Sequence, residues 1–249
     1  VIQTIDSIQI FYQIDGGTPV GETDFQQVQP DSIGIYTFTT TADLSNLATS
    51  YDITFYVVLL GDTLNVGDTL TTPVTPLNFP EVNTFPYAEN FENGQGGWTS
   101  GGTLNTWAFG TPGKTTINSA FSGVNSWVTG GLGNLSYANG EASFVIGPCM
   151  NMSAIANPVI RKGIWYESEY SFDGAVLQAS TDGGDTWTRV GEFNDPVNWY
   201  NDNFISAQPG NQPQGWTGGS NGWLLAQHAL DNLGGEPTVR LRIAFDADF

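Results

Sequence analysis

Residue types that carry most enzyme chemistry are scarce in this sequence. The chain has one cysteine, one histidine and six Lys plus Arg among 249 residues. Cys149 alone cannot form an intramolecular disulfide, and its place in an apolar run predicts a buried thiol. His228 lies near neither a Gly-x-Ser-x-Gly elbow nor a His-Glu-x-x-His motif, so we expect a polar strand residue rather than a catalytic base. A carboxylate pair for glycoside hydrolysis stays open on counts alone, but we predict a protein that is not an enzyme.

Positive charge is also scarce. The formal net charge is −19 at pH 7, and residues 1–84 contain no Lys or Arg. Such a surface repels nucleic acid and anionic lipid, so neither is an expected partner. The many carboxylates suit Ca²⁺, which takes oxygen ligands, and equally suit an acidic surface that keeps an extracellular protein soluble. Long apolar runs and a signal peptide at Val1 are absent, which predicts no direct membrane insertion and favours an internal piece of a longer polypeptide.

Sustained helical spacing of apolar residues is missing, whereas glycine is abundant at 31 residues. Gly and Asn supply the backbone conformations that tight turns need, so this composition favours short strands. Apolar and polar residues alternate over 8–14 and 51–59, and a hairpin turn is expected at 15–17. Further strands are expected over 35–39 and 68–74. Strands at this spacing predict a small β-sandwich.

Prolines gather between residues 73 and 86, where little periodicity is seen, and this favours a semi-rigid extended linker. We therefore expect an Ig-like module over 1–76, a linker over 77–84 and a second domain over 85–249. Every Trp, Lys and Arg lies in the second domain. Its clearest strand candidates are 142–146, 159–166, 175–180, 186–190 and 239–245.

Residues 180–187 match the Asp-box pattern, S-x-D-x-G-x-T-W. The pattern predicts a β-hairpin in which Asp182 accepts hydrogen bonds from turn amides, a glycine takes a positive φ, and Trp187 packs beneath. The motif resembles the Asp boxes of sialidases, where it lies away from the catalytic residues. We expect a structural role here, and a part in Ca²⁺ or sugar binding is the alternative.

A second motif, Glu-Asn-Phe-Glu-Asn-Gly at 89–94 before Trp98, resembles the first strand of jelly-roll carbohydrate-binding and adhesion domains. In those domains the Glu after Phe ligates a structural Ca²⁺ together with an Asp from the final strand. The resemblance implies a structural Ca²⁺ site with Glu92, Asp173 and Asp246 as candidate ligands. The Asp-Asn pair that ends the final strand in such domains is not found before Phe249, which implies a jelly roll without its last strand.

The whole second segment resembles the MAM-like choice-of-anchor J jelly rolls, relatives of the cleaved-adhesin domains. The resemblance rests on dispersed motifs: Phe85 to Tyr87, Trp107 to Gly110, Ser126 to Thr129, Trp165-Tyr166, Ser171 to Ala175, the Asp box, Asn198 to Tyr200 and Gly215 to Gly218. Such domains occur in proteins that the type IX secretion system of Bacteroidota exports. The resemblance implies secretion, cell-surface display, contact with the secretion machinery, further domains in the same polypeptide, and a part in adhesion or gliding motility.

The first segment resembles the CARDB-like Ig modules of the same secreted proteins, which act as spacers and display arms. The likeness rests on the motifs at 12–17, 36–40, 42–45 and 60–62, although Ser50 stands where that family often has Gly. Together the two resemblances imply an all-β chain, with an Ig-like β-sandwich followed by a jelly-roll β-sandwich.

Four Asp-Ser/Thr-aliphatic triplets occur in the first segment. They resemble the O-glycosylation triplet of Bacteroidota envelope proteins. The resemblance implies glycosylation at Ser7, Ser32, Thr63 and Thr69. The alternative is that Asp-Ser and Asp-Thr are ordinary turn pairs before an apolar strand.

Aromatic residues in long loops form the candidate ligand surface. Exposed aromatics stack on sugar rings and anchor protein contacts, so Trp199, Tyr200, Trp216 and Trp223 are candidates for binding an extracellular glycan or protein. The alternative places them in the core, where Trp is usually found. We predict an adhesion or ligand-display fragment at the cell surface. The alternatives are an accessory region of a secreted peptidase or glycosidase with its catalytic domain elsewhere, and a repeat of a long surface filament.

Overall fold

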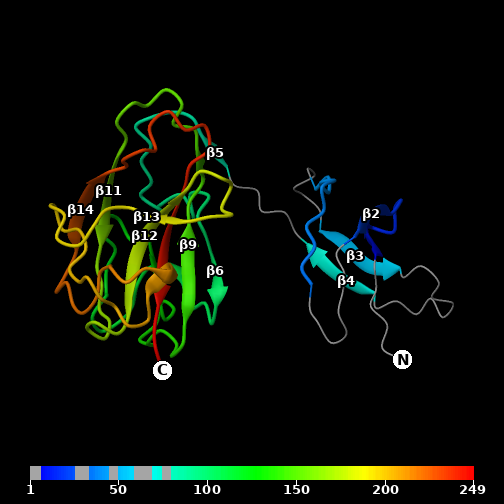
Figure 1. Cartoon of the computed structure of the whole chain (residues 1–249). Helices are drawn as coiled ribbons and strands as arrows, with labels where there is room; N and C mark the ends of the chain where they lie inside the picture. Colours follow the sequence, from blue (N-terminus) through cyan, green and yellow to red (C-terminus); the bar gives the residue numbers. More distant parts are fainter. Residues whose placement is uncertain (1–6, 26–33, 45–49, 59–68, 75–79) are drawn as a thin grey trace. The chain divides into compact units, whose positions relative to one another are not determined.

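A computed structural model describes residues 7–25, 34–44, 50–58, 69–74 and 80–249 (Figure 1). The chain divides into two compact units, Val1–Asn78 and Phe79–Phe249, with the boundary inside the predicted linker. Strands form both units, and the one helix among the described residues is a short 3-10 turn, η1 (Pro209–Asn211). The predicted all-β class is confirmed. In this part of the chain, no helix has the length and apolarity needed to cross a bilayer.

The first unit contains an antiparallel sheet in the order β2-β1-β3-β4. Its strands are β1 (Ile8–Ile14), β2 (Val20–Asp24), β3 (Tyr51–Val58) and β4 (Leu70–Val74). The period-2 alternation places Tyr12 and Ile53 on one buried face. The predicted turn is confirmed, because Asp15 and Gly16 have φ of 48° and 69° and the Gly17 amide donates to the Ile14 carbonyl at 2.8 Å. The second layer of an Ig-like sandwich stays a prediction.

The strand predicted over 35–39 is wrong, because residues 34–44 form no strand. The carboxylate of Glu22 on β2 accepts the backbone amides of Thr39 and Thr40 at 2.8–3.0 Å. It also accepts the Tyr36 hydroxyl at 2.7 Å. Amides that donate to a side chain are not available for a strand ladder, so a single carboxylate replaces the expected pairing.

The second unit has a five-stranded antiparallel sheet as its main layer. In spatial order its strands are β13 (Thr188–Arg189), β12 (Gly174–Ser180), β15 (Arg240–Asp246), β9 (Ala142–Ile146) and β6 (Thr99–Thr103). Three smaller pairs complete the unit: β11 (Val159–Ile164) with β14 (Leu224–Ala229), β7 (Ala108–Gly110) with β8 (Ser126–Val128), and β5 (Glu81–Val82) with β10 (Cys149–Met150).

The five strands predicted for this unit are confirmed: β9 has its predicted bounds, and the ends of the other four are shifted by one or two residues. Two features differ from the sequence analysis. The bounds of β14 were not predicted, although a strand was expected at His228, and β5 lies in the stretch assigned to the linker. Residues 81–82 pair in parallel with Cys149 and Met150, so they belong to the second unit. Cys149 is half-buried rather than buried, and its thiol is free.

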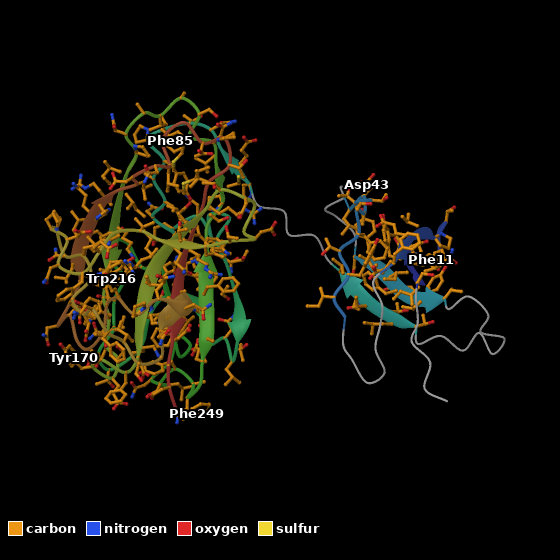
Figure 2. All side chains as sticks on the ribbon, viewed as in Figure 1. Phe11, Asp43, Phe85, Tyr170, Trp216 and Phe249 are labelled. Carbon is orange, nitrogen blue, oxygen red and sulfur yellow. The ribbon has the colours of Figure 1, made fainter. Side chains whose placement is uncertain are left out.

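The core of the second unit joins the five-stranded sheet to the β11–β14 pair, which makes the unit a β-sandwich. Leu177 and Leu241 from the sheet pack in one cluster with Ala226 from β14. In Figure 1, β11 and β14 lie on one side of this unit, and β9 and β6 lie on the other. Trp216, which Figure 2 labels, is fully buried in this unit. Buried apolar surface of this kind is the main stabilising contribution to such a fold.

Candidate functional site

Three carboxylates meet where the five-stranded sheet ends. Glu169 and Asp173 lie in the loop before β12, and Asp248 follows β15. The register pairs Gly174 with Asp246, which brings the residue before β12 next to the tail after β15. One oxygen from each of Glu169, Asp173 and Asp248 lies within 4.8 Å of the others. Carboxylates at this spacing can hold a metal ion. We call this set the acidic triad.

Asp173 anchors the acidic triad, because it is only 4% exposed and both of its oxygens are held. One oxygen accepts the Tyr137 hydroxyl at 2.6 Å, and the other accepts the Asp248 backbone amide at 2.9 Å. The Glu169 amide in turn donates to the Tyr137 hydroxyl at 3.2 Å. Burial, and then the Asp173 hydrogen bond, raise the pKa of Tyr137 above its usual value, so it stays a donor.

A depression of about 430 Å³ opens over the acidic triad. Its lining includes Ser136, Asn139 and Glu167, whose oxygens add to those of the triad. Oxygen atoms of this number and type are those that Ca²⁺ takes as ligands.

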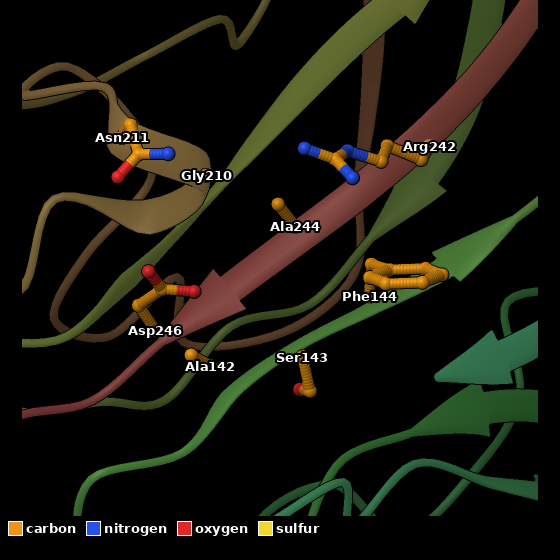
Figure 3. A pocket seen from close by; sticks show the side chains of 8 residues that line it. All are labelled: Ala142, Ser143, Phe144, Gly210, Asn211, Arg242, Ala244 and Asp246. Atoms are coloured by element: carbon orange, nitrogen blue, oxygen red, sulfur yellow. The ribbon is translucent and has the colours of Figure 1, made fainter. Parts of the chain in front are cut away.

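The predicted ligands Glu92 and Asp246 do not lie with Asp173 in one cluster of carboxylates. Among the described residues, the carboxylates that cluster with Asp173 are those of Glu169 and Asp248. Glu92 instead accepts the Val124 and Asn125 amides, each at 2.9 Å. Asp246 faces a separate pocket on β15 with Arg242 (Figure 3). Burial raises the pKa of Asp246 to about 6. The predicted set is therefore corrected to one shared residue, Asp173, with two new partners.

Sequence reasoning missed Glu169 and Asp248. Glu169 lies in an acidic run, Glu-Ser-Glu-Tyr-Ser-Phe-Asp at 167–173, which was a usable signal. Asp248 was overlooked because the expected acidic end of the last strand was placed beyond Phe249. The strand register, which sequence alone does not give, brings Asp248 to Asp173.

The predicted aromatic ligand surface is corrected for three of its four members. Trp199, Tyr200 and Trp216 are 3%, 1% and 0% exposed, and their rings pack with centroids 4.6–5.4 Å apart. Their polar atoms are satisfied internally, since Trp199 and Tyr200 donate to the Val190 carbonyl and Trp216 donates to the Asn198 carbonyl. Buried rings cannot stack on a sugar, so these residues form core.

Trp223 is the fourth member, and it is partly exposed. Its indole nitrogen donates to the Ser119 carbonyl at 3.0 Å, and its ring contacts Phe121 and Trp165 edge to face. Trp223 therefore remains a candidate contact residue.

His228 lies on β14 with both ring nitrogens in use. Nε2 lies 2.8 Å from an Asp195 carboxylate oxygen, and Nδ1 lies 2.5 Å from the Ala229 carbonyl. The ring packs on Trp199, with centroids 4.7 Å apart. Within residues 80–249, no Ser, Thr or Cys side chain hydrogen-bonds to His228. The pair therefore ties the loop at Asp195 to β14.

The Asp box forms the predicted hairpin between β12 and β13. The Asp182 carboxylate accepts the Thr186 amide at 3.0 Å and the Ser180 hydroxyl at 2.6 Å. These hydrogen bonds, led by that of Ser180, hold the pKa of Asp182 well below its usual range. The Trp187 indole donates to the Gly184 carbonyl at 2.9 Å. All donors to the Asp182 carboxylate lie within the turn, as a structural role requires.

Two of the four glycosylation candidates, Ser32 and Thr63, lie outside the described residues. Ser7 is half-buried just before β1, and Thr69 is exposed just before β4. Glycosylation of these residues stays a prediction.

A comparison with curated proteins finds a relative that matches part of the chain. No family model matches the chain. A stretch of 122 residues, 49% of the chain, is 29% identical to bacillopeptidase F of Bacillus subtilis (strain 168). The match spans 8% of that protein's length.

Among solved structures, one from a study of carbohydrate-binding modules of the β-sandwich superfamily superposes on 96% of this chain and 79% of its own. The sequence identity is 13% and the TM-score is 0.34.

Proposed function

We propose that this chain is a non-catalytic adhesion or ligand-display piece of an extracellular bacterial protein, and that its second unit carries a structural Ca²⁺ site. The acidic triad supports this proposal, because three like charges this close repel one another unless a cation neutralises them. Ca²⁺ accepts about six to eight oxygen ligands in flexible geometry, which suits an open depression lined by further oxygens. A cation here would join the loop before β12 to the tail after β15.

A thermal melt tests the cation site. CaCl₂ should raise the melting temperature of the second unit above that in EDTA at matched ionic strength. Glu169→Gln and Asp248→Asn should abolish the difference, because each removes a ligand charge without removing the Asp173 hydrogen bonds. Asp185→Asn is the matched control, since Asp185 is an exposed acid of the Asp-box turn. Equal calcium shifts in all four proteins, or no shift in the wild type, would reject the site.

The second candidate is an accessory region of a secreted hydrolase. The similarity to bacillopeptidase F favours it, because that protein is named as a peptidase and the match covers a small share of its length. The coding sequence on either side of this segment distinguishes the two candidates. A protease motif favours the accessory role, whereas further Ig-like or jelly-roll units favour an adhesin. Tandem copies of this segment would instead favour a surface filament.

A further inference from the structure

The pocket that contains Asp246 combines hydrogen-bond donors and acceptors with a small apolar surface. It measures about 200 Å³ and lies between η1 and the face of β9 and β15 (Figure 3). This is smaller than the roughly 300 Å³ at which pockets for drug-sized ligands begin, so it fits a single small ring. Its side chains come from three elements: Ala142, Phe144, Asn211, Arg242, Ala244 and Asp246.

Arg242 is held firmly while its terminal nitrogens stay open. Its Nε donates to the Gln178 side chain at 2.8 Å, and Gln178 donates to the Gly210 carbonyl at 2.8 Å. The guanidinium carbon lies 4.2 Å from the Trp187 ring centroid and 5.3 Å from that of Phe144. Among residues 80–249, Arg242 forms no ion pair, and its Nη atoms have no hydrogen-bond acceptor. A guanidinium fixed in this way loses little entropy when it binds a ligand oxygen.

Asp246 and Asn211 complement Arg242. Figure 3 shows Ala244 between the two charged side chains along β15, with Asn211 facing them from η1. A carboxylate accepts hydrogen bonds, a guanidinium donates them, and an amide does both. The exposed Ala142 side chain is small and leaves room for a ring beside Asp246, whereas Ala244 is buried against Gly210 of η1.

We propose that this pocket binds one neutral hexose unit, free or at the end of a glycan. A sugar hydroxyl both donates and accepts, so neighbouring hydroxyls match Asp246, Asn211 and the Arg242 Nη atoms at once. The C–H face of the ring matches the Ala142 and Phe144 side chains. A neutral sugar is favoured over a uronic acid, because Asp246 and the net charge of −19 repel an anion.

Calorimetric titration of the full chain with methyl glycosides of glucose, mannose and galactose, and with glucuronate, tests this site. At least one neutral glycoside should bind with millimolar affinity. Arg242→Lys and Asp246→Asn should each weaken the affinity for that glycoside about tenfold or more, because a hydrogen bond to a charged group is lost. Asp185→Asn should bind as the wild type does, and melting curves establish that each variant is folded.

A third variant that keeps the backbone conformation separates loss of binding from loss of folding. Asn211 has φ of 62°, a conformation that glycine adopts freely, so Asn211→Gly removes the amide without strain. Asn211→Gly should also weaken the binding of the sugar. Binding of glucuronate alone, binding unchanged in all three pocket variants, or no binding of any sugar would overturn the proposal. The titration and the calcium melt share only the control Asp185→Asn and change different site residues, so either site can fail without the other.

Discussion

Lys162 places an amino group in the interior of the second unit. It lies on β11 opposite Ala226, with Nζ 3.9 Å from the Trp216 ring centroid. Burial lowers the pKa of Lys162 to about 7. In the unfolded chain the same group has its ordinary pKa of 10.5. Between these values the unfolded state binds more protons than the folded state, so this residue makes stability rise with pH.

Replacing Lys162 with methionine should remove that pH dependence. Between pH 7 and pH 9, the wild type should gain up to roughly 1.4 kcal/mol of unfolding free energy per pH unit relative to Lys162→Met. Chemical denaturation at several pH values, followed by Trp fluorescence, measures the difference. Arg161→Met is the control, because Arg161 is exposed on the same strand. A wild type and Lys162→Met with parallel pH profiles would show that the amino group stays charged in the fold.

Elements encoded by neighbouring residues were predictable, and elements defined by distant contacts were not. The turn at 15–17 and the Asp-box hairpin follow from local side-chain and glycine chemistry. A strand was expected at His228, but the bounds of β14 were not predicted, because its sequence, Leu-Leu-Ala-Gln-His-Ala, shows no clean alternation and pairs with β11 60 to 70 residues away. The acidic triad was only partly found for the same reason. Asp173 was named from its motif, whereas Asp248 reaches it through the β12–β15 register.

The segment at 36–40 shows how one residue can override strand propensity. The carboxylate of Glu22 receives the Thr39 and Thr40 amides, and these bonds, with the Tyr36 hydroxyl, lower its pKa to about 2. The stabilisation from a lowered carboxyl pKa is present above the ordinary value of 4.5 and is lost as the pH falls through about 2. Solvent screens this exposed site, so the effect should be local rather than global.

Glu22→Ala should therefore free these amides. We expect faster hydrogen exchange at Thr39 and Thr40 near neutral pH, because both amides lose their acceptor. Exchange measured by NMR in β12 of the other unit serves as the internal reference. Acidifying the wild type through pH 2 should bring its exchange at Thr39 toward that of the variant, after correction for the intrinsic rate. Protection that survives the substitution would mean that another contact holds the segment.

At the scale of the whole molecule, charge is distributed unequally between the two units. All six Lys and Arg residues lie after residue 84, so the first unit carries carboxylates without any cationic side chain. Like charges on a compact surface destabilise it, and salt screens them, with a Debye length of about 10 Å at 0.1 M that falls to about 3 Å at 1 M. Mutual repulsion should therefore weigh more heavily on the first unit than on the second.

Sodium chloride should accordingly raise the melting temperature of the first unit more than that of the second. Each kcal/mol of repulsion removed should raise it by roughly 4–8 °C for a domain of this size. The two transitions are separable because all eight Trp residues lie in the second unit. Trp fluorescence reports the second unit alone, while far-ultraviolet circular dichroism reports both. At pH 4, where many carboxylates are protonated, the salt effect should shrink. If salt shifts the melting temperature of the second unit as far as that of the first, Lys and Arg do not reduce the charge repulsion in the second unit.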